Sequence, residues 1–212
     1  MLRITGGEHC GRKLRVPAVA ATRPLVERAR EGVMNHLRAE VPGAVVWDVY
    51  AGSGILGLEA LSRGAAEVVA IERHPRAGQQ LVENAKLLRM ESRLRLLKVD
   101  AHRLPEMVQA ESKALPRPDL IFFDPPYADF RNGGPGRTKV WGLFCALAAL
   151  LSEDGVAVVH TPKGILDEGE RAALPGIEQR DYGSTSLYWW HRPTKPEAVQ
   201  DESGPAQEEQ ER

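Results

Sequence analysis

The most specific chemical signal in the sequence is the run Asp124-Pro125-Pro126-Tyr127, which directly follows an apolar segment. Two prolines remove two N–H donors and stiffen the chain, which leaves the carbonyl of Pro125 free. A planar exocyclic amine could donate its two N–H groups to Asp124 and to that carbonyl while its ring stacks on Tyr127. Acceptors held in this way orient the nitrogen lone pair toward an electrophile and take up positive charge as the amine attacks. These four residues are therefore predicted to be catalytic, against the alternative of a simple turn.

A glycine-rich segment after another apolar run is the second signal, and it spells G-x-G-x-x-G. Its glycines permit a tight turn and close approach of a ligand, and the N-terminus of the following helix offers free N–H groups. The pattern alone is weak, because many nucleotide-binding sheets share it. The residues expected to bind a cofactor here are Asp48, Ala51, Gly52, Ser53, Gly54 and Gly57.

Two further acids follow predicted strands. Glu72 comes eighteen residues after Gly54, and a carboxylate at that place can accept both hydroxyls of a ribose. Asp100 could accept from an adenine amine, although an N-cap for the next helix explains it nearly as well. Both are predicted to bind the cofactor.

The net charge of −1 conceals an asymmetry along the chain. Residues 1–30 carry seven Lys and Arg against two Glu, whereas residues 197–212 carry six acids against one Arg. A basic head on a near-neutral body favours contact with a polyanion, and a solvated surface with a chance excess of charge is the alternative. The residues expected to contact the phosphates of such a polyanion are Arg12, Lys13, Arg15, Arg23 and Arg30, with Arg131 and Arg137 of a later glycine-rich loop closing over it.

Strands that alternate with helices must position these groups. Apolar runs of the kind found in buried parallel strands lie at 45–50, 68–71, 94–99, 120–123 and 156–159. The third contains Arg95 and Lys98, which indicates a less central strand. Two closing runs, 177–183 and 186–191, are predicted to be antiparallel. The pattern predicts an open α/β sheet covered on both faces, whose ligands bind at the carboxyl ends of the strands.

The ends of the chain differ from this core. Residues 1–42 are predicted to form a basic extension, a short hairpin and then a helix that begins at Pro24. Residues 43–193 form the main domain, and the acidic residues 194–212 are expected to be disordered. Two cysteines make no disulfide framework, no zinc spacing occurs, and no apolar run is long enough for a bilayer. A cytoplasmic protein is expected.

Together, these motifs resemble the class I, S-adenosylmethionine-dependent methyltransferases that methylate amines. The N-terminal segments resemble one family in particular, the bacterial RsmD family. The matching segments are Arg3-Ile-Thr-Gly-Gly, Gly11-Arg-Lys-Leu, Arg23-Pro24, Arg30-Glu31 and Asn35-His-Leu37, and the resemblance covers about residues 2–192. Leu25, Met34, a long segment at 128–139 and the acidic tail depart from the family pattern.

The resemblance implies a Rossmann-like fold with a seven-stranded, mostly parallel sheet and an antiparallel last strand. It also implies transfer of a methyl group from S-adenosylmethionine to the N2 amine of a guanine in small-subunit (16S) ribosomal RNA. A monomer acting on a ribosomal subunit or assembly intermediate, without a metal, is expected. The alternatives are an NAD-dependent oxidoreductase, a DNA adenine-N6 methyltransferase and a catalytically silent RNA-binding assembly factor.

Overall fold

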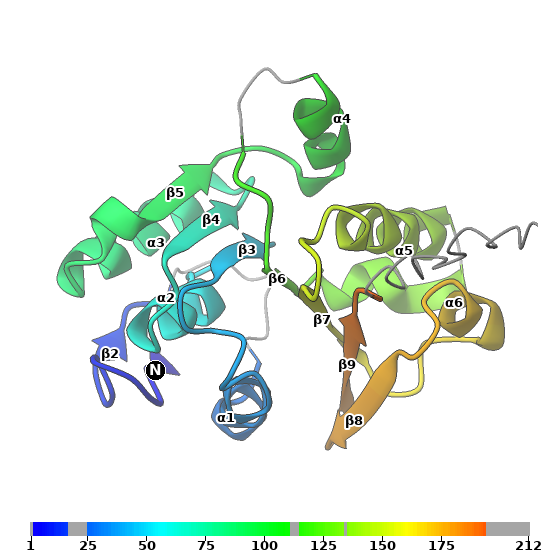
Figure 1. Cartoon of the computed structure of the whole chain (residues 1–212), viewed down its shortest axis with the longest axis horizontal. Coiled ribbons are helices and arrows are strands. Elements are labelled where there is room, and N and C mark those ends of the chain that lie inside the picture. Colours follow the sequence, from blue (N-terminus) through cyan, green and yellow to red (C-terminus); the bar gives the residue numbers. More distant parts are fainter. Residues whose placement is uncertain (1, 17–24, 111–114, 134, 194–212) are drawn as a thin grey trace, which may run out of the picture.

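One seven-stranded sheet crosses the middle of the molecule (Figure 1). The structure is a computed structural model that describes residues 2–16, 25–110, 115–133 and 135–193. From one edge to the other, the strands are β5 (Leu94–Leu97), β4 (Glu67–Ile71), β3 (Val45–Val49), β6 (Leu120–Phe123), β7 (Val156–Pro162), β9 (Thr185–His191) and β8 (Glu178–Tyr182).

The directions of the strands confirm the expected topology. The first five strands in this order are parallel, and β9 runs antiparallel to both β7 and β8. Strand β5 lies at the edge of the sheet, as its charged residues indicated. The fold is therefore the predicted α/β arrangement of a class I methyltransferase.

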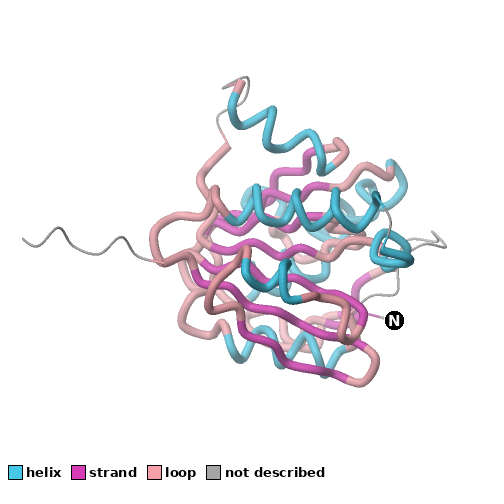
Figure 2. Tube along the Cα trace, turned by 90° about the vertical axis from the view of Figure 1, so that its right-hand side faces the viewer, coloured by secondary structure: helices cyan, strands magenta, loops and turns pink. Residues whose placement is uncertain are grey.

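Helices cover both faces of the sheet (Figure 2). On one face, side chains of α1 (Glu27–His36), α2 (Ile55–Ser62) and α3 (Pro75–Leu87) share one apolar cluster with the strands. On the other face, a second cluster includes residues of α4 (Leu104–Gln109) and α5 (Pro135–Ala148), and α6 (Glu168–Ala172) lies between two of its members, Leu166 and Leu174. Short 3₁₀ helices are η1 (Glu91–Arg93), η2 (Ala101–Arg103) and η3 (Tyr127–Gly133).

Alternation along the central strands explains how one sheet serves two cores. In β3, Val46 belongs to the first cluster and Trp47 to the second, because successive side chains point to opposite faces. Both are buried, so the strand reads as a continuous apolar run. Among the described residues, no helix is both long and apolar enough to span a membrane.

The N-terminal extension shares its core with the sheet. Strands β1 (Leu2–Arg3) and β2 (Lys13–Leu14) form an antiparallel pair, and their apolar residues join the first cluster. The backbone N–H of Thr5 donates to the buried carboxylate of Glu59 on α2 at 2.9 Å. This contact ties the hairpin to the helix that follows the glycine-rich turn.

Two sequence-based boundaries need correction. Helix α1 begins at Glu27 rather than at Pro24, because Leu25 and Val26 are not helical. The segment 128–139, expected to be a loop, is largely helical, since η3 and α5 occupy it except at residue 134, which lies outside the described residues. The predicted tail, residues 194–212, also lies outside them.

Candidate active site

The predicted strand-end residues meet at one edge of the sheet. The last paired residues of β3, β4 and β6 are Val49, Ile71 and Phe123. Parallel strands in register end together, so Glu72 and Asp124, which follow two of them directly, lie near the turn that follows β3. The register of the sheet therefore brings the cofactor and amine motifs to one place.

The glycine-rich turn is fixed by its own backbone. Gly52 and Gly54 have positive φ angles of 56° and 78°, a conformation that favours glycine. The N–H of Gly57 donates to Oδ2 of Asp48 at 3.0 Å, and a Cβ at Gly57 would lie 2.8 Å from Cγ1 of Val68. A Cβ at Gly54 would likewise lie 2.7 Å from Cγ of Leu81, so Gly54 and Gly57 have no room for a side chain, whereas Gly52 is favoured by its φ angle alone.

Asp48 supports the turn from below. Its side chain is buried beneath the turn and does not line the cavity described below. Burial raises its pKa to about 8, against the effect of the Gly57 hydrogen bond, and the Asp124 and Glu72 carboxylates act in the same direction as burial. Direct cofactor contact by Asp48 is thus not what this structure favours.

Glu72 connects two backbone segments. Its Oε2 accepts from the N–H of Gly52 at 2.8 Å, and its Oε1 accepts from the N–H of His74 at 2.6 Å. Each oxygen keeps a second lone pair for a ligand hydroxyl. The carboxylate therefore holds the glycine-rich turn and can still accept from a ribose.

Asp100 has the capping role considered for it, and it is not among the residues that line the cavity described below. It caps η2 by accepting from the N–H of His102 at 3.0 Å, which is the structural role expected as the alternative. It also pairs with Arg73 at 2.8 Å. Partial burial opposes its ionisation, but the His102 and Arg73 contacts outweigh burial and lower its pKa.

A cavity of about 130 Å³ lies at these strand ends, and we call it the strand-end cavity. Its walls include apolar side chains, the Glu72 carboxylate and Asp124. Tyr50 also lines it with a buried hydroxyl that has no hydrogen-bond partner among the described residues. The full lining is Tyr50, Gly52, Ile71, Glu72, Arg73, His74, Ala77, Val99, Ala101, Asp124 and Pro126.

Asp124 is held by a histidine that the sequence analysis did not single out. Oδ1 of Asp124 lies 2.6 Å from Nδ1 of His160, and Nε2 of His160 lies 2.8 Å from the hydroxyl of Tyr127. That hydroxyl is also 2.6 Å from Oγ1 of Thr185. Tyr127 therefore contributes a hydroxyl that contacts His160 and Thr185, in addition to a ring for stacking. Within the described residues, the Pro125 carbonyl accepts no backbone hydrogen bond, as expected.

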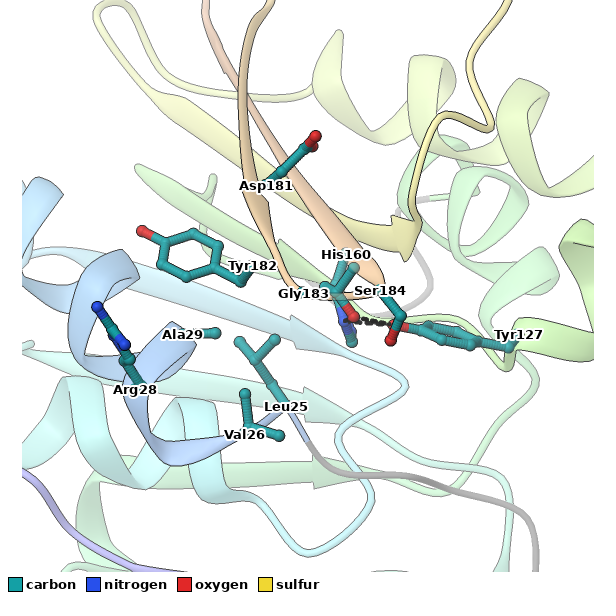
Figure 3. Close-up of a pocket in the computed structure, with 11 residues that line it drawn as sticks. Leu25, Val26, Arg28, Ala29, Tyr127, His160, Asp181, Tyr182, Gly183 and Ser184 are labelled. Carbon is teal, nitrogen blue, oxygen red and sulfur yellow. Dashed lines mark hydrogen bonds between the residues drawn. The ribbon is translucent and has the colours of Figure 1, made fainter.

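A larger cavity of about 560 Å³ lies on the other side of this group (Figure 3). We call it the α1 cavity, because the start of α1 and the turn between β8 and β9 form its walls. His160 of β7 and Tyr127 of η3 both line it (Figure 3). Its lining is Leu25, Val26, Arg28, Ala29, Tyr127, His160, Asp181, Tyr182, Gly183, Ser184 and Thr185.

The seven basic residues predicted to contact RNA divide into three groups: exposed residues, residues outside the described part of the chain, and residues used inside the protein. Arg12, Lys13 and Arg15 are exposed on the N-terminal hairpin, in agreement with a surface role. Arg23 and the side chain of Arg131 lie outside the described part of the chain.

Two arginines need correction. Arg30 is 1% exposed and donates to the carbonyls of Leu25 and Arg3 at 3.1 and 2.7 Å, so its guanidinium is used inside the protein rather than on a phosphate. Burial lowers its pKa. Arg137 does not belong to a loop over the RNA: it lies on α5 and pairs with Glu170 at 2.5 Å.

The position of His160 was the signal that could have identified it. It follows Val159, which pairs with Phe123, so it is the direct neighbour of Asp124 across β6 and β7. A histidine near the carboxyl end of a strand beside the catalytic strand is a candidate active-site residue on topology alone.

Among the described residues, no group of three His, Cys, Asp or Glu side chains could hold a metal ion.

Comparison with known proteins agrees with this geometry. A family model described as "Conserved hypothetical protein 95" matches residues 2–191. The chain belongs to this family. It is the RsmD family expected from the motifs, and "Ribosomal RNA small subunit methyltransferase D" of Escherichia coli (strain K12) is 39% identical over 132 residues. That match covers 62% of this chain and 62% of the relative.

Two solved structures extend the likeness over most of the chain. The "Putative methyltransferase yhhF" of Escherichia coli has a TM-score of 0.70 and 27% identity, covering 92% of this chain and 99% of that one. A hypothetical protein of Thermus thermophilus has a TM-score of 0.70 and 31% identity, covering 90% and 99%. The similarity therefore includes the N-terminal extension as well as the sheet.

Proposed function

We propose that this protein transfers a methyl group from S-adenosylmethionine to the exocyclic N2 amine of a guanine in small-subunit (16S) ribosomal RNA. One observation carries the proposal. Asp124 lines the strand-end cavity, and the same carboxylate is bonded to His160, which lines the α1 cavity. An acceptor for an amine thus stands between the recess that the predicted cofactor residues line and a second, larger recess that is open to a substrate.

The strand-end cavity fits the proposed cofactor. Ile71, Ala77 and Val99 supply apolar walls for an adenine, and the Glu72 carboxylate supplies acceptors for ribose hydroxyls. The unpartnered Tyr50 hydroxyl offers a further polar contact. When bound, S-adenosylmethionine supplies an electrophilic methyl group on a sulfonium. The residues that line the cavity hold this methyl group in position for the reaction.

The residues at the end of β6 supply the acceptors. Asp124 accepts one N–H of the guanine amine, and the Pro125 carbonyl accepts the other. Both bonds strengthen as positive charge develops on the nitrogen, so they stabilise the transition state more than the bound substrate. The ring of Tyr127, which lines the α1 cavity, packs against the base and holds the orientation of its plane. The target base leaves its stack to reach this place.

The N-terminal hairpin supports ribosomal RNA as the substrate. Arg12, Lys13 and Arg15 are exposed there and can neutralise phosphates. The E. coli relative is named for methylation of small-subunit ribosomal RNA, and we extend that substrate class to this chain. We further propose that the protein acts as a monomer in the cytoplasm on a small subunit or its assembly intermediate.

A direct assay tests the proposal. Purified protein is incubated with methyl-labelled S-adenosylmethionine and small ribosomal subunits from a strain that lacks this gene. The RNA is then digested and its nucleosides separated by mass. We expect label in N2-methylguanosine at a single site. Naked 16S RNA in a parallel reaction determines whether the assembled particle is needed.

The alternatives predict other outcomes. Label in N6-methyladenine of duplex DNA would identify a DNA methyltransferase. Calorimetric titration that shows binding of NAD and none of S-adenosylmethionine would identify an oxidoreductase. Binding to the particle without methyl transfer would leave an assembly factor. Each of these results contradicts the proposed reaction.

A further inference from the structure

His160 is the buried polar residue that connects the two cavities. It lies on β7, its side chain is 4% exposed, and it is one residue beyond the pair Phe123 and Val159 in the parallel register. The Asp124 side chain beside it is 25% exposed. A buried imidazole with a partner on each ring nitrogen is fixed in orientation, since rotation would break both contacts.

The partners of His160 also fix the direction of the hydrogen bonds. An ionised carboxylate can only accept, so Nδ1 of His160 carries the proton that is donated to Asp124. In the neutral imidazole, Nε2 then accepts from the Tyr127 hydroxyl, and the Tyr127 oxygen accepts from Thr185. The chain therefore runs from Thr185 through Tyr127 and His160 to Asp124, over distances of 2.6, 2.8 and 2.6 Å.

This arrangement gives the two carboxylate oxygens of Asp124 different partners. Oδ1 of Asp124 is occupied by His160, which leaves Oδ2 for an N–H of the substrate. Without the imidazole, the carboxylate could rotate about its last torsion, because such torsions have broad minima. An acceptor that must turn into place during the reaction stabilises the transition state less than one already in place.

We propose that His160 is a positioning residue, which acts through Asp124 by holding its Oδ1 and so directing Oδ2 toward the reacting amine. Tyr127 and Thr185 hold His160 from the side of the α1 cavity. The inference rests on the proposed function. It predicts that the effect of His160 falls on turnover, since the residue touches neither the cofactor nor the attacking nitrogen.

Two substitutions separate the two ring nitrogens. In His160→Asn, the side-chain amide nitrogen takes about the position of Nδ1, and it can still donate to Asp124. In His160→Gln, the terminal amide takes about the position of Nε2, so the contact with Tyr127 is kept and the one with Asp124 is lost. The two variants are matched in polarity and both lack the ring.

We expect His160→Gln to lower kcat in the methyl-transfer assay by about 10- to 100-fold, which is the scale of a misplaced catalytic group. The KM values for RNA and S-adenosylmethionine should change less than about threefold. His160→Asn should retain kcat within about threefold of the wild type. Equal loss in both variants, or loss confined to KM, would show a merely structural role and overturn the proposal.

A second measurement does not depend on methyl transfer. Nitrogen-15 NMR of the histidine rings should show His160 as the Nδ1–H tautomer at neutral pH, and Asp124→Ala should abolish that preference. An Nε2–H tautomer in the wild type would refute the proposal even if both His160 variants failed to fold. If the tautomer is as expected but the wild type methylates no RNA, the proposed function is wrong and the contact between His160 and Asp124 still stands.

Discussion

Asp124 of the strand-end cavity is bonded to His160 of the α1 cavity, yet the two cavities are built in different ways. The strand-end cavity depends on backbone groups: Glu72 accepts from two backbone N–H groups, and Gly52 and Gly54 adopt positive φ angles. The α1 cavity combines side chains of α1, η3, β7 and the β8–β9 turn, and its link to Asp124 passes through side chains alone.

This difference implies that the cofactor site tolerates few substitutions, whereas the α1 cavity can vary in its residues. A backbone turn allows little variation in residue type, so the cofactor position is specified by glycines and one acid. Side-chain contacts between distant elements can change one at a time while the fold is kept. We therefore expect substitutions on the cofactor side to affect binding, and substitutions at the junction with the α1 cavity to affect turnover.

The largest expected effect tests the junction itself. Asp124→Ala removes the charged acceptor that strengthens in the transition state, and it should lower the single-turnover rate of methyl transfer by about 10²- to 10³-fold. Binding of S-adenosylmethionine, measured by calorimetry, should change little. Asp129→Ala is the matched control, because Asp129 is close in sequence but lines neither cavity. A near wild-type rate for Asp124→Ala would exclude the amine-clamping mechanism.

The next effect belongs to the cofactor side. Glu72→Ala leaves the ribose hydroxyls and the N–H groups of Gly52 and His74 without their acceptor, at a cost of about 1–3 kcal/mol. Cofactor affinity should therefore fall by about 10- to 100-fold in calorimetric titration. Glu67→Ala removes a carboxylate at the other end of β4 and should leave affinity unchanged. Unchanged affinity in Glu72→Ala would mean that the cofactor binds elsewhere.

The same contrast explains what the sequence could predict. The strand-end acids were recognisable because each follows a local apolar run. The parallel register of the strands then brings these acids together at one edge of the sheet. His160 is 36 residues from Asp124, and its meaning depends on which strands become neighbours. The sequence contains that pairing only implicitly, so His160 becomes a candidate only once β6 and β7 are recognised as neighbouring strands.

Arg30 shows a second limit of sequence-based inference. Its charge favours the surface, as is usual for arginine, but it precedes Val33 by three residues and Met34 by four. Those spacings place it on the buried face of α1, where it satisfies two backbone carbonyls. Helical spacing carried this information, whereas total charge in the first 30 residues did not.

A smaller effect is expected at the N-terminal hairpin, which borders neither cavity. Replacement of Arg12, Lys13 and Arg15 together by Ala removes three exposed charges. The slope of log RNA affinity against log salt concentration should therefore become shallower by about two to three. Cofactor affinity should be unchanged. Lys139→Ala, an exposed charge on α5, serves as control. An unaltered slope in the triple variant would assign the hairpin a purely structural role.

The last prediction concerns Asp48 under the cofactor turn, and its effect is on stability rather than on binding or turnover. Its pKa is raised from 3.8 to about 8 by burial, so the folded protein holds a proton that the unfolded chain releases between those values. Stability therefore falls as pH rises from about 4 to about 8, by at most about 1.4 kcal/mol per pH unit from this group. Asp48→Asn can keep the Gly57 hydrogen bond without a titrating group, so the variant should gain stability over the wild type across that range.

Urea unfolding between pH 4 and pH 9 measures the difference, and Asp181 provides a control of opposite sign. Hydrogen bonds from Gln179, Ser186 and Lys163 lower the pKa of Asp181 to about 2. Its contribution is present above the unfolded pKa near 4 and is lost only as pH falls toward 2, so Asp181→Asn should not change the slope between pH 4 and pH 8. If Asp48→Asn also left that slope unchanged, Asp48 would be ionised beneath the turn at neutral pH. The cofactor side would then hold a buried negative charge of its own, and the contrast between a backbone-built site and a side-chain-built site would have to be revised.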